Sequence, residues 1–311
     1  MRRSRQRGAA AEPVTRDFGR PSSISVVIAA YKALPEIDTQ LEALAAQDFD
    51  GEFEVIISDN FGEAGLREHI ETHPLRDRLR LRCVDSSELA GTSHARNVGS
   101  RASTMEFIAY CDQDDAVYPS WLSAMADTAA NHGMVGGLLE RDTLNAPDVA
   151  QWRALPPADK LPVLAHFLPI TFGANMGIWR SVFDEIGGWD DTYPTAGSDV
   201  DICWRAQLAG HTLGYNQKAL VAYRYRTTMG EMFDQAVSYN VAEARLSKQY
   251  AAHGARGSNP LILIGYAGWL LLWLPVLPWN WSSARRGQFM WVAGAVTGRL
   301  RGSRQYRHLY L

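Results

Sequence analysis

Residues 106–115 read Glu-Phe-Ile-Ala-Tyr-Cys-Asp-Gln-Asp-Asp, an apolar run that ends abruptly in carboxylates. This pattern predicts a buried strand that breaks into a loop. Upstream of it, three apolar runs alternate with three helix-like segments. The strands are expected at 24–30, 53–57 and 79–84, and the helices at 37–47, 64–72 and 92–102. The alternation predicts an α/β fold with a mostly parallel central sheet.

The carboxyl ends of the predicted strands carry the first candidate functional residues. Ligands of parallel α/β sheets bind beyond those ends. Tyr31 follows the first strand, Asp59 ends the second, and Asp112 and Asp114 follow the fourth. Two carboxylates at i and i+2 suit Mg²⁺ or Mn²⁺ bound together with substrate phosphates, and a solvated acidic turn is the alternative. Asp59 fits a hydrogen bond to a nucleobase and also an Asx turn with Asn60, and the two roles are compatible.

Two further motifs carry candidate roles. Arg96 lies at the start of the predicted helix 92–102, where it can pair with a phosphate or orient a metal-binding carboxylate, and a surface ion pair is the alternative. Asp199 opens a predicted helix at 198–209 and is a candidate general base. The competing interpretation is structural, because Ser198 and Asp201 have the spacing of a capping box. The sequence leaves both interpretations open.

Other site classes are disfavoured. The first strand is not followed by G-x-G-x-x-G, and G-x-x-x-x-G-K-[ST] is absent, which argues against a dinucleotide fold or a P-loop. The three cysteines are widely spaced, as in a reduced cytoplasmic protein. We expect no zinc site among the eight histidines.

Taken in order, six blocks of the chain resemble the family 2 inverting glycosyltransferases, which have the GT-A fold of nucleotide-diphospho-sugar transferases. The blocks are residues 26–31, 54–60, 91–99, 108–115, 187–190 and 198–205. The resemblance covers about residues 24–226. Two departures stand out: Ser198 occupies a position where the family often has Glu, and residues 222–226 carry two arginines where many members have a histidine.

The resemblance implies a role for each matching residue. The donor would contact Ala29, Ala30, Tyr31, Asp59, Arg96, Asp112 and Asp114, and Asp112 and Asp114 would hold Mg²⁺ or Mn²⁺. Asp199 would be the catalytic base, and Asn175 and Trp189 would lie on the acceptor side. The implied function is inverting transfer of a sugar from a nucleotide-diphosphate sugar to a hydroxyl of a glycan or lipid-linked acceptor, in cell-envelope or lipid-linked glycan synthesis. A nucleotidyltransferase and a non-catalytic sugar-nucleotide-binding homologue remain alternatives.

Charge divides the chain into an acidic body and a basic tail. All 34 acidic residues lie at or before Glu243, and nine Lys or Arg follow it. The acidic body argues against nucleic acid as a partner, and the basic tail favours an anionic membrane surface. We expect a disordered basic leader at 1–22, a catalytic domain at 23–226 and a helical membrane-associating region at 227–311.

Residues 261–279 are almost wholly apolar and rich in tryptophan near their end. They are close to the roughly 20 residues needed to span a bilayer. Three interpretations remain: a re-entrant or interfacial helix, a true span, or a helix buried in a core or an oligomer. The first, with the basic tail, predicts a cytoplasmic protein held at the cytoplasmic face of the membrane.

Overall fold

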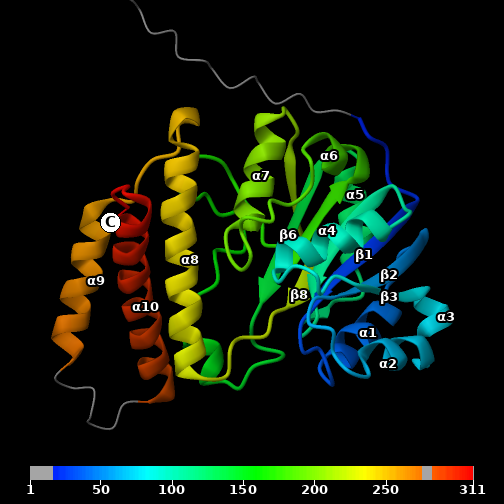
Figure 1. Ribbon diagram of the computed structural model, residues 1–311, viewed down its shortest axis with the longest axis horizontal. Coiled ribbons are helices and arrows are strands. Elements are labelled where there is room, and N and C mark those ends of the chain that lie inside the picture. Colours follow the sequence, from blue (N-terminus) through cyan, green and yellow to red (C-terminus); the bar gives the residue numbers. More distant parts are fainter. Residues whose placement is uncertain (1–16, 275–281, 311) are drawn as a thin grey trace, which may run out of the picture.

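Strands and helices alternate along the first 110 residues as the sequence predicts (Figure 1). The computed structural model describes residues 17–274 and 282–310. The strands are β1 (Ser23–Ala30), β2 (Glu52–Asp59), β3 (Leu81–Asp85), β4 (Phe107–Asp112), β5 (Ala116–Val117), β6 (Met134–Glu140), β7 (Asn175–Trp179) and β8 (Leu213–Ala222). The helices are α1 (Ile37–Ala45), α2 (Leu66–Thr72), α3 (Arg76–Leu79), α4 (Thr92–Ala102), α5 (Trp121–Ala129), α6 (Arg180–Glu185), α7 (Ser198–Leu208), α8 (Met229–Gln249), α9 (Pro260–Trp273) and α10 (Ser283–Tyr306), with short 3₁₀ turns at Val149–Gln151 and Ala251–His253.

The eight described strands form one sheet in the order β3-β2-β1-β4-β7-β6-β8-β5. Neighbours β3, β2, β1 and β4 are parallel, and β6 and β8 are parallel to each other. The antiparallel pairs involve β7 and β5. The sheet is therefore mixed but mostly parallel, which confirms the predicted fold class. Buried β-branched and aliphatic residues of β1, β2 and β4 form its core, as expected for strands covered on both faces.

Several predicted elements differ in their bounds. The third strand begins two residues later than expected because the short helix α3 takes residues 76–79. The sequence also predicts a last strand at about residues 219–225, and in the structure this strand, β8, begins at Leu213 and ends at Ala222. Its first half was missed because polar residues there pair with β6 at an irregular register. The sequence prediction also did not include α5, β6 and α6.

The C-terminal region forms a layer of three helices, with α10 between α8 and α9 (Figure 1). Gly294, Gly298 and Gly302 recur every four residues on the side of α10 that faces α8. A Cβ on Gly298 would lie 2.6 Å from the Val237 carbonyl oxygen, so only glycine permits this approach of the two backbones. The basic tail therefore includes a helix, α10, that packs closely on α8 through these three glycines.

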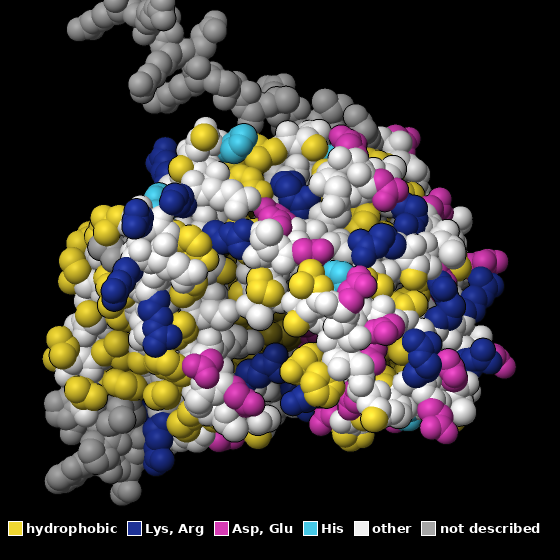
Figure 2. Space-filling model, in the orientation of Figure 1, with side chains coloured by type: hydrophobic (Ala, Val, Ile, Leu, Met, Phe, Trp, Pro, Cys, Tyr) yellow, Lys and Arg dark blue, Asp and Glu magenta, His cyan; other side chains and the backbone are white. Residues whose placement is uncertain are grey.

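Helix α9 has no buried residue, although its sequence is apolar throughout. The exposed fractions of Leu261, Leu271 and Leu272 are 69%, 70% and 76%. In Figure 2 hydrophobic side chains gather over the side of the molecule where α9 lies. Among helices of the described residues, none has the length and apolar character needed to cross a bilayer. The end of the predicted segment, residues 275–279, lies outside the described residues.

The last residues of the leader expected at 1–22 contact the sheet domain. Residues 1–16 lie outside the described part. Phe18 stacks on Trp179 with ring centroids 5.4 Å apart. Arg20 pairs with Asp50 and Asp127 at 2.7 Å each. Residues 17–22 are therefore attached to the domain. The three cysteines are free, as predicted.

Candidate active site

The candidate residues meet where the parallel strands end. Across the sheet Ala30 pairs with Asp59, and Ala29 pairs with Asp112. The ends of β1, β2 and β4 therefore lie side by side and bring their following loops to one edge. This is the edge where ligands of α/β sheets bind.

Two exposed aromatic rings flank this edge. Tyr31 is 54% exposed and Phe61 is 45% exposed, and their ring centroids lie 4.9 Å apart. The Lys32 Nζ lies 5.7 Å from the Tyr31 centroid and 5.1 Å from the Phe61 centroid. Aromatic faces of this kind can stack with a nucleobase. Phe61 and Lys32 were not among the predicted site residues.

Gln113 holds the Tyr31 backbone from the acidic loop. The Tyr31 N–H donates to Gln113 Oε1 at 2.6 Å, and Gln113 Nε2 donates to the Tyr31 carbonyl oxygen at 2.9 Å. This two-way bond ties the loop after β1 to the loop after β4. The residue between Asp112 and Asp114 thus couples the aromatic pair to the carboxylates, a role that the D-x-D spacing alone did not reveal.

Asp59 forms the Asx turn that the sequence offered as one alternative. Its Oδ1 accepts the N–H groups of Phe61 and Gly62, and its Oδ2 accepts the N–H of Glu63, all at 3.0 Å. The turn orients the loop that carries Phe61. Because a carboxylate oxygen can accept two hydrogen bonds, Oδ2 keeps capacity for a further donor such as a base N–H.

Three carboxylates crowd the end of β4. Burial, together with the Asp112 charge, raises the pKa of Asp114, while Arg226 opposes that rise. Burial raises the pKa of Asp115 well above its usual range, and the neighbouring charges of Asp112 and Asp114 add to the effect. The Asp115 Oδ2 is buried and has no hydrogen-bond partner among the described residues. Repulsion among adjacent carboxylates is what a divalent cation relieves, so this donor set fits Mg²⁺ or Mn²⁺.

Arg96 positions Asp112. Its Nη2 donates to Asp112 Oδ1 at 3.0 Å, and its guanidinium lies 4.7 Å from the Trp189 ring centroid. The residue is 6% exposed, so it has little surface for a ligand. A Cβ on Gly173 would lie 2.6 Å from the Arg96 Cζ, so this glycine provides the space for the guanidinium. Of the two roles the sequence offered for Arg96, orientation of a carboxylate is the one this geometry supports.

Asn97, the residue after Arg96 on α4, holds the turn at residues 187–190, between α6 and α7. Asn97 accepts the Trp189 N–H at 2.9 Å and donates to the Trp189 carbonyl oxygen at 2.8 Å. Gly188 has φ +71°, and a Cβ there would lie 2.7 Å from Asn97 Oδ1. The block 91–99 and the block 187–190 therefore fit together through Arg96, Asn97 and Trp189.

Asp199 lies at the start of α7 and remains partly exposed. Its Oδ1 accepts the Val200 N–H at 2.9 Å, and its Oδ2 accepts the Gly173 N–H at 3.4 Å. Burial raises the pKa of Asp199, and the Arg96 charge opposes that rise. Gly173 contacts both side chains, so it connects Asp199 to the Arg96–Asp112 pair.

The capping-box interpretation of Ser198 and Asp201 is wrong. The N-cap of α7 is Gly197, and no side chain caps this helix. Asp201 is fully buried and instead pairs with Arg205 at 2.7 Å and accepts the Tyr250 hydroxyl at 2.6 Å. It joins α7 to the end of α8. A true capping box occurs at the start of α8, between Thr228 and Glu231.

The two residues assigned to the acceptor side are buried. Asn175 is fully buried: its Nδ2 donates to the carbonyl oxygens of Leu138 and Ala219, and its Oδ1 accepts the Trp121 Nε1–H. Its side chain joins strands of the sheet and does not reach solvent, so direct contact with an acceptor does not fit. Trp189 is 3% exposed and supports Arg96 from beneath. Both assignments followed motif position, which carries no information on burial.

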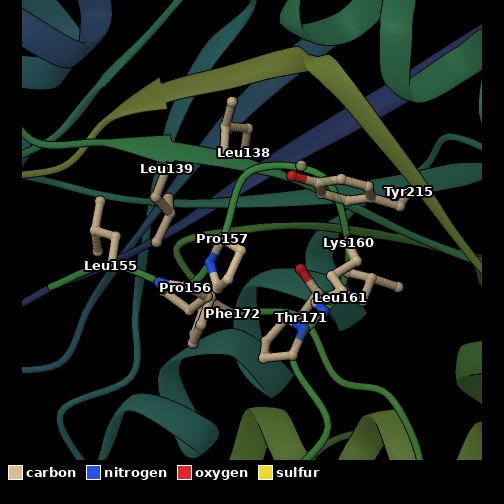
Figure 3. Close-up of a pocket in the computed structure, with 12 residues that line it drawn as sticks. Leu138, Leu139, Leu155, Pro156, Pro157, Lys160, Leu161, Thr171, Phe172 and Tyr215 are labelled. Carbon is tan, nitrogen blue, oxygen red and sulfur yellow. The ribbon is translucent and has the colours of Figure 1, made fainter.

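The small enclosed cavity drawn in Figure 3 is not part of this site. Figure 3 shows an apolar cavity of about 20 Å³ beside β6, lined by Leu138, Leu139, Leu155, Leu161, Phe172 and Tyr215 among others. A volume of this size holds about one water molecule. It is too small for a nucleotide sugar and is separate from the carboxylate edge.

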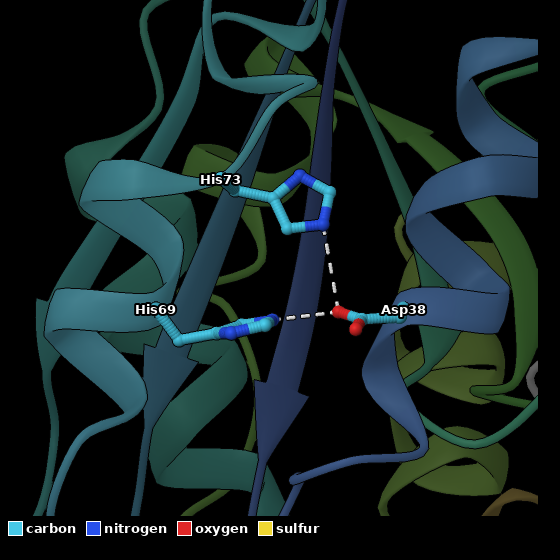
Figure 4. Close-up of side chains that lie close together, drawn as sticks. All are labelled: Asp38, His69 and His73. Atoms are coloured by element: carbon cyan, nitrogen blue, oxygen red, sulfur yellow. Dashed lines mark hydrogen bonds and ion pairs between the residues drawn. The ribbon is translucent and has the colours of Figure 1, made fainter.

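A second possible metal-binding group lies elsewhere. Asp38, His69 and His73 place one ligand atom each within 4.8 Å of one another (Figure 4). The Asp38 Oδ1 lies 2.6 Å from His69 Nε2 and 3.5 Å from His73 Nε2. The expectation of no zinc site among the histidines overlooked the four-residue spacing of His69 and His73, which makes this group a candidate. Imidazole ligands suit zinc, whereas carboxylates suit magnesium and manganese, so this group is distinct from the acidic edge.

Comparison of the sequence with known protein families identifies the family of this chain. The model of "Glycosyl transferase family 2" matches residues 25–187, just over half of the chain. The chain belongs to glycosyl transferase family 2. The match includes Tyr31, Asp59, Arg96, Asp112 and Asp114, and it ends before Asp199.

Two curated relatives and a solved structure agree with this family. The pre-mycofactocin glycosyltransferase of Mycobacterium tuberculosis is 30% identical over 199 residues, which cover 59% of this chain and 39% of that protein. The chain thus spans well under half the length of this relative. The glucosyl-dolichyl phosphate glucuronosyltransferase of Haloferax volcanii is 26% identical over 226 residues, covering 66% of this chain and 71% of that protein.

The solved structure is a mannosyltransferase from Pyrobaculum calidifontis in complex with GDP-Man and Mn²⁺. It aligns with a TM-score of 0.55 and 20% identity, over 92% of this chain and 89% of that one. At this identity the likeness establishes the fold, which is of the GT-A type, with a curled and mostly parallel central sheet.

Proposed function

We propose that this family 2 chain transfers a sugar, with inversion, from a nucleotide-diphosphate sugar to an acceptor hydroxyl. One observation carries the proposal: a single edge of the sheet brings together the exposed Tyr31–Phe61 pair, Asp114 and the Arg96-bound Asp112, and Asp199. These parts correspond to the base, the diphosphate and the reacting hydroxyl of one bound donor and acceptor.

The donor binds along the strand ends. Tyr31 and Phe61 stack with the base, Asp59 accepts a base N–H through Oδ2, and the backbones of Ala29 and Ala30 line the path to the carboxylates. Asp112 and Asp114 hold Mg²⁺ or Mn²⁺ together with the diphosphate. The Mn²⁺ and GDP-Man in the Pyrobaculum calidifontis mannosyltransferase support this arrangement. When bound, the metal ion neutralises charge that develops on the leaving diphosphate.

Asp199 acts as the general base. Its carboxylate takes the proton of the acceptor hydroxyl while the oxygen attacks the anomeric carbon from the face opposite the leaving diphosphate, so one displacement inverts the configuration. A pKa raised by burial makes the carboxylate a better proton acceptor than an exposed aspartate. Arg96 keeps Asp112 oriented and helps to keep Asp199 ionised. Holding donor and acceptor side by side lowers the entropic part of the barrier.

We propose further that the acceptor is presented at a membrane, as a lipid-linked glycan or cell-envelope precursor. The exposed apolar surface of α9 lies beside the basic helix α10, a combination that suits an anionic lipid surface at the cytoplasmic face. The dolichyl phosphate in the name of the Haloferax volcanii relative supports a lipid-linked acceptor.

A panel of nucleotide sugars tests the proposed function. The protein is incubated with Mn²⁺ and each donor, and release of the nucleoside diphosphate is measured. Slow hydrolysis of one or a few donors, lost in EDTA, is the expected result. Donor binding without any hydrolysis or transfer supports a non-catalytic homologue, and release of pyrophosphate from a nucleoside triphosphate with a sugar phosphate supports a nucleotidyltransferase.

A further inference from the structure

A cavity of about 310 Å³ lies between α10 and the irregular segment that follows β6. This volume is at the lower end of the range for small-molecule sites. The lining combines cations, amides and aromatic rings: Arg141, Gln151, Trp152, Arg153, Gln288 and Trp291. None of these residues belongs to the donor edge described above.

The cavity holds two cations, Arg141 and Arg153. Among the described residues, no carboxylate lies within 4.0 Å of the guanidinium of Arg141 or Arg153. Arg141 donates through Nη1 to the Arg153 carbonyl oxygen. The Arg153 Nε is buried and has no hydrogen-bond partner in the described part of the chain.

Aromatic rings surround Arg153. Its guanidinium lies 4.7 Å from the Tyr225 centroid and 5.0 Å from the Trp291 centroid, with Tyr223 at 5.3 Å and Tyr239 at 5.9 Å. Ring faces attract a cation and hold it in place, but they supply no counter-charge and accept no hydrogen bond from Nε. A partly buried guanidinium without an anion is costly, so the cavity is electrostatically complementary to an anionic ligand.

This cavity adjoins the donor edge through the segment after β8. Asn145 donates to the Tyr223 carbonyl oxygen at 2.8 Å and accepts the Tyr225 N–H at 2.7 Å. Between these two residues, Arg224 donates through Nε to the Asp114 carbonyl oxygen at 2.8 Å. The wall of the cavity and the acidic loop are thus joined by three consecutive residues.

We propose that this cavity binds the phosphate or diphosphate ester group of the acceptor. The inference rests on the proposed function and names the acceptor class. Arginine forks match phosphate oxygens, and the amides of Gln151 and Gln288 can donate to the same group. A phosphate held here lies next to the segment in which Arg224 bonds the Asp114 carbonyl oxygen, so the cavity and the donor edge are neighbouring sites.

The apolar surface of α9 lies near the same end of α10. The Trp269 ring is 6.1 Å from Phe289, the residue after Gln288, and the Arg285 guanidinium is 5.8 Å from the Trp273 ring. A lipid-linked phosphate would place its hydrocarbon on this surface and its phosphate in the cavity. The shared chemistry is a phosphate ester, and a soluble sugar phosphate is the other possible source.

Binding of inorganic pyrophosphate in EDTA tests the cavity itself. Without a divalent cation the Asp112–Asp114 site does not hold a diphosphate. The heat measured on titration with pyrophosphate therefore comes from binding in the cavity. Loss of Arg153 could disturb folding, so the test variant is Gln288→Glu, an exposed position where a negative charge repels the ligand. The matched control is Gln305→Glu, the same change about 25 Å further along α10.

We expect wild-type protein and Gln305→Glu to bind pyrophosphate equally, and Gln288→Glu to bind at least 10-fold more weakly. Equal affinity in all three proteins, or no binding by wild type in EDTA, overturns the proposal. Vesicles distinguish the source of the phosphate. Phosphatidylcholine vesicles with a polyprenyl phosphate should retain wild type better than vesicles with an equal fraction of phosphatidylserine. Equal retention on both, with the pyrophosphate effect intact, assigns the site to a soluble phosphate ester.

The donor-hydrolysis panel on wild-type protein runs in parallel. If wild type hydrolyses a donor and Gln288→Glu binds pyrophosphate as tightly as wild type does, the proposed acceptor site is refuted and the proposed function is retained. Weakened pyrophosphate binding without hydrolysis of any donor has the opposite meaning, because the anion site then stands and the proposed function fails.

Discussion

Substitution of Gly173 by Ala should displace Arg96 and weaken donor binding. The new Cβ would lie 2.6 Å from Arg96 Cζ and 2.7 Å from Nη2, whereas ordinary contact begins at 3.4 Å. Nη1 would lie closer still to the new Cβ, so the guanidinium must move by at least about 0.8 Å, the difference between 3.4 and 2.6 Å. A movement of that size is enough to lengthen the 3.0 Å bond to Asp112 beyond hydrogen-bond range. Although arginine is flexible, this one is buried between Trp189 and Asp112.

Two effects determine the free-energy cost of Gly173→Ala. Overpacking of a buried site costs about 1–3 kcal/mol of folding free energy. Loss of a charge-assisted hydrogen bond costs about 1.5–3 kcal/mol. We expect the overpacking to lower the free energy of unfolding of Gly173→Ala by about 1–3 kcal/mol in urea. The lost hydrogen bond, which orients Asp112, should raise the donor Kd roughly 10-fold in calorimetry with Mn²⁺, which corresponds to about 1.4 kcal/mol.

The control for this prediction is the same substitution in an Arg96→Ala background. Removal of the guanidinium removes the clash, so Gly173→Ala should then change neither stability nor donor affinity further. If Gly173→Ala alone leaves both quantities at wild-type values, the role of Arg96 in holding Asp112 is refuted.

Further predictions concern Asp199, the packing of α10 on α8, and the membrane. Asp199→Asn should keep donor affinity and lower kcat by roughly 10²–10⁴-fold, and normal turnover would exclude it as the base. Burial raises the pKa of Asp199 above 3.8, so the wild-type rate should fall as the pH drops through that raised pKa. As the pH rises from 3.8 through the raised pKa, the free energy of unfolding of wild type should fall relative to that of Asp199→Asn. Urea midpoints of the two proteins that coincide at every pH would contradict this. Gly298→Ala should lower the free energy of unfolding by about 1–3 kcal/mol because its Cβ meets α8, whereas Gly265→Ala on the open surface of α9 should not. Membranes from expressing cells should release the protein in high salt or alkaline carbonate; recovery of the whole protein without membranes would refute attachment through α9.

The sequence predicts the sheet because its signal is local. Apolar runs such as residues 24–30 and the carboxylates that follow strands determine the strand ends, and the register of β1 with β2 and β4 brings those ends together. Tyr31, Asp59, Asp112 and Asp114 therefore lie at one edge as predicted.

Burial and pairing between distant segments are not local, and there the prediction fails. Asn175 and Trp189 have the right place in their motifs, but contacts with Trp121 and Arg96 bury them. Asp201 has the spacing of a cap, yet its partner Tyr250 is 49 residues away. Likewise the glycines of α10 are needed because α8 packs against them, and that contact is not visible in the sequence of α10 alone. The basic charge of the tail does not predict this helix packing either.

The central claim is that Asp112 and Asp114 bind the donor diphosphate through a divalent cation. Calorimetric titration with a donor identified in the hydrolysis panel tests it directly, for wild type with Mn²⁺, for wild type in EDTA, and for the double variant Asp112→Asn and Asp114→Asn with Mn²⁺. The account predicts binding in the first titration and none in the other two. Equal donor affinity in Mn²⁺ and in EDTA would contradict it.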